Sequence, residues 1–397
     1  MSEKSVQARI PELDGLRGMA IFLVVAGHYA FTIQGSSIGH LLHTSLNLYW
    51  TGVDLFFVLS GFLIGGILMD HRESPSYFRT FYTRRFFRIV PVYYIWICAY
   101  ILLVTFGGAF LRAHMNTGTI QPVDREILSH FLFLQNFDVP SSTLSFPWLG
   151  PMWSLAVEEQ FYLVAPLVIF LVPQRSLPWL LGTAICCAPL LRIIVRMGFL
   201  PFLGAPGLAA AFLAMPCRAD ALALGMMAAF LWRNPRARSW FSSKTSKLYA
   251  AFGVLLAGMA ILWKWFPKSL SSGEESFGFT WIALFYTVAL LLSLLSSSGP
   301  IARVARMAWL RELGKLSYCM YIIHVAVDFL CFKIGHTTVG VSFPHDLAIT
   351  LLAAAITYTI AKLSWVFFEQ PLLRLGHRFT YAPAPASPAL SPAAESV

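Results

Sequence analysis

The chain has 397 residues, of which 57% are hydrophobic and only 12% are charged. Soluble domains carry about 25% charged residues. This composition, with a mean hydropathy of +0.66, therefore excludes a soluble globular enzyme, a disordered chain and a coiled coil. A net charge of +10 would suggest nucleic acid in a soluble protein. Here the basic residues lie in short loops between apolar runs, which points to a lipid bilayer and to no nucleic-acid partner.

Ten apolar runs are long enough to cross a bilayer, which takes about 17–25 helical residues. They predict an all-α membrane bundle with ten transmembrane helices at 17–34, 47–69, 89–106, 148–172, 177–197, 209–232, 248–266, 277–296, 315–334 and 346–368. The fifth run is the weakest, because Pro189, Arg192 and Arg196 interrupt it.

The distribution of basic residues predicts the orientation. If the N-terminus is cytoplasmic, the inside segments hold twenty Lys and Arg residues and the outside segments hold seven. Because cytoplasmic loops carry the excess of positive charge, both termini are predicted to be cytoplasmic. We expect a cytoplasmic segment at 1–16, a membrane domain at 17–375 and a disordered Pro/Ala-rich tail at 376–397. The first run has no cleavage site at its end, so it is expected to remain as a signal anchor.

The first predicted span contains Arg17 and His28. Eleven residues make almost three helical turns, so both side chains share a face and lie roughly 16 Å apart along the axis. A histidine deep in a membrane is a candidate functional residue, and imidazole suits general-base catalysis. The alternative is a histidine hydrogen-bonded between helices and an arginine that only anchors the span. Spacing alone does not separate the two.

Three arginines, Arg84, Arg85 and Arg88, precede the third span at helical spacings of three and four residues. Guanidinium groups on one helix face match phosphate oxygens in pairs, so they are candidates for holding a cytoplasmic phosphate-bearing ligand. An interfacial anchor for anionic lipid is the simpler alternative.

Glu158, with Glu159 beside it, lies about ten residues into the fourth span. One interpretation pairs a carboxylate with an intramembrane arginine, for which Arg192 and Arg218 are available, and this is slightly favoured. The other gives Glu158 a role in binding an acceptor or orienting a catalytic histidine.

The ninth span carries Tyr318, Tyr321 and His324, of which the first two share a helix face. A polar contact between helices is the alternative for His324. Further candidates for a substrate site or a charge network are Asp14, Asp54, Arg218 and Asp220. Small residues, Ser60, Gly61, Gly65 and Gly66, predict close helix packing. No cysteine spacing indicates a metal site or disulfide framework, and we expect no metal.

Seven segments together resemble the acyltransferase-3 family of polytopic membrane O-acyltransferases, over residues 10–375. They are, in order, ELDGLRGMAIFLVVAGH, GVDLFFVLSGFLI, RRFFRIVPVYY, WSLAVEEQFYL, CRADALALG, LSYCMYIIH and FEQPL. The first resembles the family's Arg-x10-His signature at Arg17 and His28, and the third its Arg-x-x-Arg motif at Arg85 and Arg88. The fourth resembles its WSL-x-x-E element, which points to Glu158.

The resemblance implies a membrane enzyme of about ten spans that moves an acyl group, often acetyl, from cytoplasmic acyl-CoA to a carbohydrate-type hydroxyl. Acyl-CoA is then a substrate, and no tightly bound cofactor is expected. Some members carry an extra hydrolase-like domain, and we expect this chain to be a stand-alone membrane domain without it. A bacterial inner membrane is the expected location.

Residue chemistry and resemblance lead to one hypothesis. His28 is the general base, and Arg17 orients the donor or stabilises charge on the thioester oxygen. Glu158, expected nearer the outer face, holds the acceptor sugar or completes a charge network. The Arg84, Arg85 and Arg88 cluster binds the donor phosphates. A membrane transporter of a small anionic or acyl-bearing substrate is the alternative, because intramembrane ionisable residues also mark transport paths.

Overall fold

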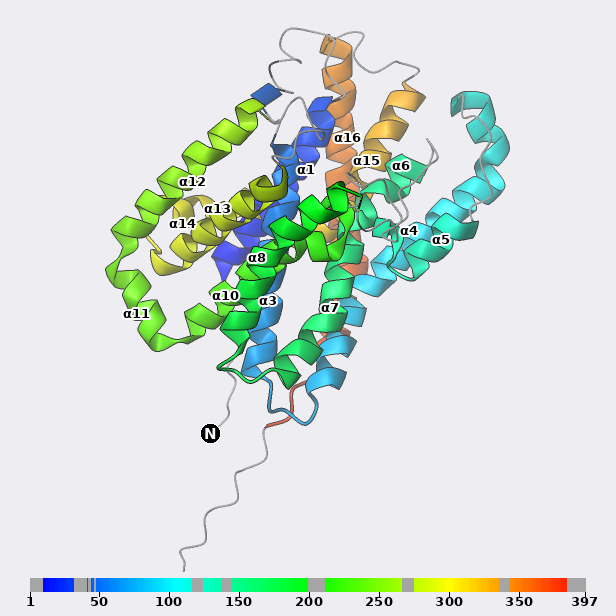
Figure 1. The fold of residues 1–397 in the computed structure, drawn as a ribbon. Coiled ribbons are helices and arrows are strands. Elements are labelled where there is room, and N and C mark those ends of the chain that lie inside the picture. Colours follow the sequence, from blue (N-terminus) through cyan, green and yellow to red (C-terminus); the bar gives the residue numbers. More distant parts are fainter. Residues whose placement is uncertain are drawn as a thin grey trace, which may run out of the picture.

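The structure is a computed structural model that describes residues 10–31, 41, 44–45, 48–115, 124–137, 145–198, 211–265, 275–335 and 343–383. All regular secondary structure in these ranges is helical, as expected (Figure 1). Eight described helices are long and apolar enough to cross a membrane. These eight spans are built on α3 Gly52–Asp70, α4 Tyr77–Met115, α7 Trp153–Leu171, α8 Leu177–Arg196, α12 Thr245–Trp265, α13 Glu275–Leu295, α15 Ala308–Ile334 and α16 Phe343–Ser364.

The predicted count of ten spans is not confirmed. The two that are missing correspond to α1 (Pro11–Phe31) and α10 (Ala219–Arg233). The first turns of α1 carry two acidic residues and Arg17, which lower its hydropathy. A 3-10 turn at Met215–Arg218 precedes α10 and leaves it only 15 residues. This turn breaks the run expected at 209–232, of which residues 209–210 lie outside the described ranges.

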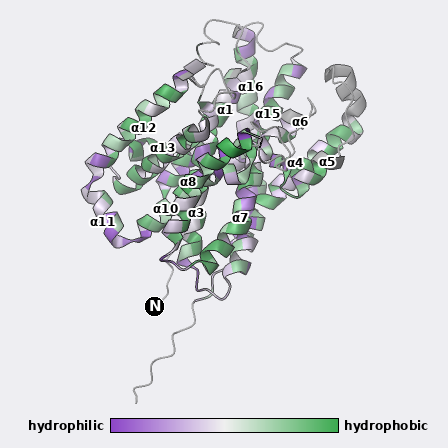
Figure 2. Ribbon diagram, in the orientation of Figure 1, coloured by the Kyte–Doolittle hydropathy of each residue, from purple (hydrophilic) through white to green (hydrophobic). Residues whose placement is uncertain are grey.

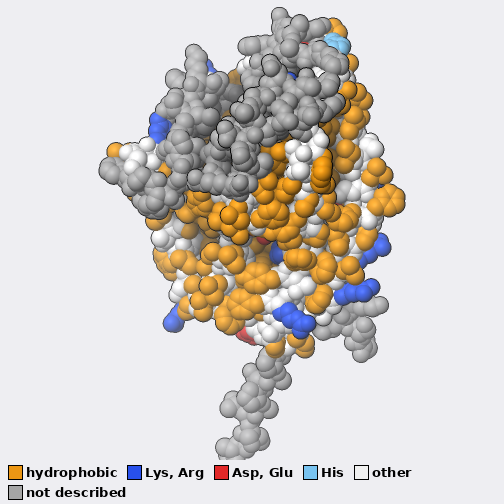
Figure 3. Space-filling model, turned by 90° about the vertical axis from the view of Figure 1, so that its right-hand side faces the viewer, with side chains coloured by type: hydrophobic (Ala, Val, Ile, Leu, Met, Phe, Trp, Pro, Cys, Tyr) orange, Lys and Arg blue, Asp and Glu red, His pale blue; other side chains and the backbone are white. Residues whose placement is uncertain are grey.

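These two helices lie inside the bundle. α1 packs against α15 and α3, and α10 packs against α3, α8 and α13. The apolar helices around them cover their polar residues, so the two central helices need not be apolar enough to face lipid. Hydrophobic residues dominate the long helices in Figure 2, and apolar side chains form a broad band across the surface in Figure 3. Lys and Arg side chains lie along the lower border of that band, as expected at the edge of a membrane (Figure 3).

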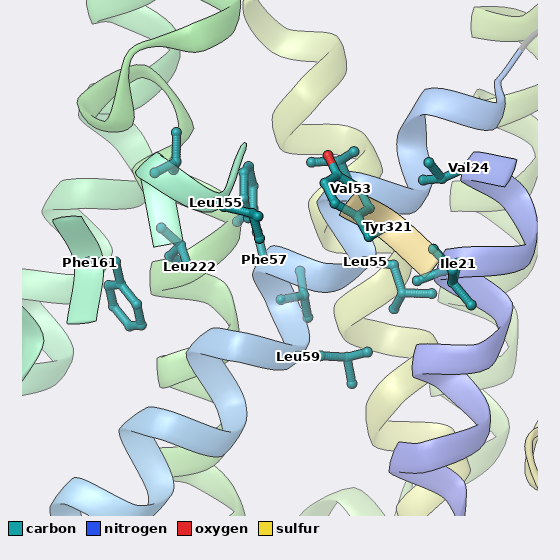
Figure 4. Packing of buried hydrophobic residues seen from close by; sticks show 14 of the residues in the cluster. Ile21, Val24, Val53, Leu55, Phe57, Leu59, Leu155, Phe161, Leu222 and Tyr321 are labelled. Atoms are coloured by element: carbon teal, nitrogen blue, oxygen red, sulfur yellow. The ribbon is translucent and has the colours of Figure 1, made fainter. Parts of the chain in front are cut away.

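The central helices approach closely where glycines replace larger side chains. A Cβ atom on Gly61 of α3 would collide with the Leu222 carbonyl of α10, and one on Gly225 would collide with the Val58 carbonyl. This confirms the close packing predicted from the small residues of the second span. Buried side chains from α1, α3, α7, α10 and α15, including Ile21, Phe57, Leu155, Leu222 and Tyr321, then join into one core (Figure 4).

Shorter helices connect the long ones: α5 Asp124–Phe131, α6 Ser145–Leu149, α11 Pro235–Ser243, α14 Pro300–Ala305 and α17 Gln370–Gly376. α16 passes through a π-helical turn, Trp365–Glu369, directly into α17. The helix therefore continues beyond the predicted end of the tenth span at residue 368.

Residues 377–382, which we call the C-terminal strap, lie along the start of α4. Arg84 Nε donates to the Phe379 carbonyl at 2.8 Å, and Thr80 Oγ1 donates to the Thr380 carbonyl at 3.2 Å. Ser74 Oγ donates to the Ala382 carbonyl at 2.8 Å. Residues 384–397 lie outside the described ranges, so the predicted disordered tail stays a prediction there.

One cavity is lined by both Ile10 and His377. The start of α1 and the C-terminal strap therefore lie on the same side of the bundle, which we call the terminal side. That this side faces the cytoplasm stays a prediction from the basic loops.

Candidate active site

A small cavity of about 80 Å³ lies where α1, α3, α4, α7 and α15 meet, and we call it the inner cavity. It brings together candidates from four segments that are far apart in the sequence. Among its lining residues are Arg17, Arg85, Arg88, Glu158, Tyr318 and Tyr321. The convergence of so many polar groups in the centre of an apolar bundle marks this cavity as the candidate active site.

Glu158 is held in the inner cavity by two hydroxyl groups. Ser60 Oγ donates to its Oε1 at 2.9 Å, and the Tyr162 hydroxyl donates to its Oε2 at 3.0 Å. The favoured pairing of Glu158 with Arg192 or Arg218 is wrong, because those arginines pair with other carboxylates. Glu158 instead shares the cavity with Arg17 and Arg88, rather than lying apart from them near the opposite face.

A second, larger cavity of about 730 Å³ lies on the terminal side, and we call it the vestibule. Arg17 and Arg88 line both the vestibule and the inner cavity. The two arginines thus stand at the junction of the two cavities. Neither of them makes a hydrogen bond or ion pair with another residue in the described ranges, so both guanidinium groups are available to a ligand. Asp14, another predicted candidate, also lines the vestibule.

The three arginines before the third span do not form one cluster. Arg84 donates to the strap at Phe379 and lies over the Tyr381 ring, 5.2 Å from its centroid. Arg85 lines the inner cavity, with the Tyr162 ring at 5.6 Å. Only Arg88 lies at the junction of the two cavities. The prediction that the three guanidinium groups share one face is therefore wrong for Arg84, which the strap, more than 290 residues away in sequence, occupies.

His28 contacts the other candidate histidine, His324. His28 Nδ1 lies 3.3 Å from His324 Nε2, and the centroids of the two rings are 4.9 Å apart. His324 Nδ1 lies 2.8 Å from the Tyr321 carbonyl, and His28 Nδ1 lies 2.8 Å from the Val24 carbonyl. Since a carbonyl only accepts, this network assigns the proton to Nδ1 on both rings. Nε2 of His28 then carries a lone pair and makes no hydrogen bond with any residue in the described part of the chain.

Tyr321 connects the histidine pair to the inner cavity. Its hydroxyl, which lies 2.6 Å from Ser154 Oγ, belongs to the cavity lining, and its ring lies 5.9 Å from that of His324. Tyr318, one turn earlier, lines the same cavity and donates to the Ile89 carbonyl at 2.9 Å. The shared face predicted for these two tyrosines is confirmed.

A separate group of buried charges lies between α3, α8 and α10. Arg218 pairs with Asp54 at 2.7 Å, and Arg192 pairs with Asp220 at 2.9 Å. The Arg218 guanidinium also lies over the Phe279 ring at 4.0 Å. These four candidates therefore form a charge network, and none of them lines the inner cavity.

Two residues that contact Glu158 were missed as functional candidates. The sequence motifs mark Ser60 only as a small residue for close helix packing, and they do not single out Tyr162. The sequence did hold a signal for Tyr162, because it follows Glu158 by four residues and so shares its helix face. No local signal connects Ser60 to Glu158, since they lie on different helices.

The acyltransferase domain model matches residues 10–365. The chain belongs to the acyltransferase-3 family. It is 26% identical over 381 residues to the peptidoglycan O-acetyltransferase OatA of Listeria monocytogenes, covering 92% of this chain and 56% of that protein. It is 27% identical over 390 residues to the O-acetyltransferase OatA of Staphylococcus aureus, covering 94% and 59%. The putative peptidoglycan O-acetyltransferase YrhL of Bacillus subtilis is 27% identical over 393 residues, covering 93% and 56%.

No solved structure matches the chain. The chain spans less than two thirds of the length of these relatives. The predicted family is thus confirmed, and with it an acyltransferase domain in a multi-pass membrane protein with bacterial homologues. The family favours the enzyme over the transporter that the sequence left as an alternative.

Proposed function

We propose that this protein transfers an acetyl group from acetyl-CoA to a hydroxyl of a cell-envelope glycan. The observation that carries this proposal is the junction at Arg17 and Arg88, which line both the vestibule and the inner cavity. A donor with a phosphate-bearing nucleotide fits the larger, basic vestibule. Its acylated arm then passes between the arginines into the inner cavity. The names of the relatives support peptidoglycan as the glycan class.

His28 is the general base of the proposed reaction. Its Nε2 takes the proton of the acceptor hydroxyl, and the oxygen attacks the thioester carbonyl. The C–S bond of the resulting tetrahedral intermediate then breaks, and the imidazolium returns its proton to the thiolate. The Val24 carbonyl accepts from His28 Nδ1–H at 2.8 Å and so keeps the lone pair on the reacting Nε2. His324, whose Nε2 lies 3.3 Å from the same Nδ1, is a positioning residue because its ring packs against that of His28.

Arg17 supplies positive charge to the donor end of the same path. It lies on α1 with His28, roughly 16 Å away along the helix axis. This separation suits the extended arm of the donor, with Arg17 near its phosphate end and the thioester close to His28. Glu158, fixed by Ser60 and Tyr162, presents a carboxylate that orients the acceptor in the inner cavity.

The test uses the purified full chain in nanodiscs with radiolabelled acetyl-CoA and soluble peptidoglycan fragments. Wild type should form labelled ester, and His28→Ala should lower product formation by at least a factor of about 100, the lower range for a lost general base. His345→Ala is the matched control, because His345 is exposed and lines neither cavity. Its activity should equal that of wild type.

Equal product from His28→Ala and wild type would remove His28 as the base. If label is transferred to other glycans and not to peptidoglycan fragments, the proposed acceptor is wrong, while acetyl transfer to a glycan hydroxyl is upheld. The same protein is also reconstituted in sealed liposomes: if wild type forms no labelled ester and moves acetyl-CoA unchanged into the liposome lumen, the transporter interpretation replaces the enzyme.

A further inference from the structure

The vestibule contains two groups of basic residues at different distances from the inner cavity. Arg17 and Arg88 form the junction with the inner cavity. Arg374, His377 and Arg378 line the vestibule only, and we call them the vestibule rim. The rim belongs to α17 and the start of the C-terminal strap, whose position is fixed by the contacts with α4 described above.

The rim charges are not neutralised within the described part of the chain. Arg374 and Arg378 have exposed side chains that form no ion pair with described residues. By contrast, Arg233, which lines the same cavity, is paired with Asp70 through two bonds of 2.6 Å. Partial burial, and then the neighbouring Arg84, Arg88 and Arg85, lower the pKa of His377, so positive charge adjoins this imidazole. Such a site is favourable for an anion of high charge.

The vestibule also offers aromatic surface. Trp232 and Trp365 line it together with the basic residues. Bases stack on aromatic side chains, while arginine forks bind phosphate oxygens. A cavity of about 730 Å³ is within the range of sites that hold a small molecule. Aromatic and basic groups that line one cavity favour a nucleotide over a lipid headgroup, which has phosphate but no base.

We propose that the vestibule rim binds the ribose 3′-phosphate of the donor nucleotide, while Arg17 and Arg88 bind its diphosphate. The proposal rests on the proposed function, in that the donor is a coenzyme A thioester. Coenzyme A carries its diphosphate nearer the thioester and its 3′-phosphomonoester at the nucleotide end. This order matches the order of the junction and the rim. A phosphomonoester carries close to two negative charges near neutral pH, so the rim discriminates strongly between donors with and without it.

The experiment combines a protein change with a ligand change. Binding of coenzyme A and of 3′-dephospho-coenzyme A is measured by calorimetry on the full chain in phosphatidylcholine nanodiscs. The variants are wild type, Arg374→Gln/Arg378→Gln, the charge-conserving Arg374→Lys/Arg378→Lys, and Arg303→Gln. Arg303 of α14 is exposed and lines neither cavity, so it controls for a general loss of surface charge. kcat/KM for the two acetylated donors is measured in parallel.

The double Gln variant should weaken coenzyme A binding about tenfold or more, the range for lost hydrogen bonds to a charged group. It should leave dephospho-coenzyme A binding unchanged, and the Lys variant should recover part of the loss. An equal loss of affinity for both ligands in the double Gln variant would overturn the proposal. No loss of affinity for either ligand would also overturn it, and this is the result expected if the rim binds lipid headgroups instead. If wild type does not bind coenzyme A, two statements fail together: that the rim binds the 3′-phosphate, and that the donor is a coenzyme A thioester. Binding without acetyl transfer would overturn only the proposed function, since the comparison of the two ligands still decides the role of the rim.

Discussion

The ion pair between Asp54 and Arg218 allows a quantitative test of how burial determines the energy of a charge pair. Both side chains are only 1% exposed, and their atoms lie 2.7 Å apart. Arg233 and Asp70 form a pair of similar length, 2.6 Å, but with side chains 31% and 36% exposed. Both pairs join an arginine to an aspartate; the exposed pair has two hydrogen bonds and the buried pair has one, so burial and not the number of bonds makes the buried pair the costlier one to break.

Replacing Arg218 by Met leaves the Asp54 carboxylate buried without its partner. Breaking a buried pair in this way costs about 3–5 kcal/mol. The part of this cost that is specific to Arg218 comes from Asp54 Oδ1, which loses its hydrogen bond to the guanidinium. Arg233→Met should cost only about 0.2–1 kcal/mol, because solvent screens the exposed pair.

The free energy of unfolding is measured by titrating detergent-solubilised protein with sodium dodecyl sulfate and following tryptophan fluorescence. Arg218→Met should be less stable than Arg233→Met by at least about 2 kcal/mol. The double variant Asp54→Leu/Arg218→Met should recover most of the loss, since it removes both charges. Equal destabilisation by the two single variants, or no recovery in the double variant, would refute the reasoning from burial.

Further predictions follow from the packing and the histidines. Gly61→Val should destabilise the protein in the same titration, whereas Gly253→Val should not, because a Cβ at Gly253 meets no atom within 4 Å; similar effects would contradict the close approach of α3 and α10. His324→Phe should lower kcat about 10–100-fold with little change in the donor KM, the pattern expected when an orienting contact is lost; a change in KM alone would instead indicate a donor contact. Because the pKa of His377 is lowered in the folded state, the unfolded chain takes up this proton first as the pH falls below about 6.5. Wild type should therefore lose more stability than His377→Gln between pH 7 and pH 5.5, and parallel losses would argue against a lowered pKa.

The sequence predicted well the helices that face lipid. It predicted less well the helices that are surrounded by other helices of the protein. Eight predicted spans correspond to helices that qualify by length and hydropathy. α1 and α10 do not qualify, because the polar residues of its first turns lower the hydropathy of α1 and because α10 has only 15 residues; other helices surround both. Hydropathy reports contact with lipid, so it underestimates helices at the centre of a bundle.

Candidate residues were predictable by type, and their partners were not. Arg17, His28 and Glu158 stand out as ionisable residues within apolar runs. Their partners depend on which helices are neighbours, and that information is absent from local spacing. Glu158 meets Ser60 across 98 residues of sequence, and Arg218 meets Asp54 across 164. Helical periodicity therefore correctly placed Tyr318 and Tyr321 on one face of their helix, where both line the inner cavity, but the buried arginines were assigned to the wrong carboxylate.

The position of the C-terminal strap has a consequence for biosynthesis. The strap binds the start of α4, a helix made about 300 residues earlier, so its contacts form only after α17 has left the ribosome. Until then the vestibule lacks Arg374, His377 and Arg378 on one side. We expect a chain that stops after residue 376 to insert into the membrane and to bind coenzyme A more weakly than the full chain, as measured by the same calorimetry. Unchanged affinity would show that Arg378 and His377 are not needed for the donor. One wall of the vestibule is thus added only after the helices that surround it have been made.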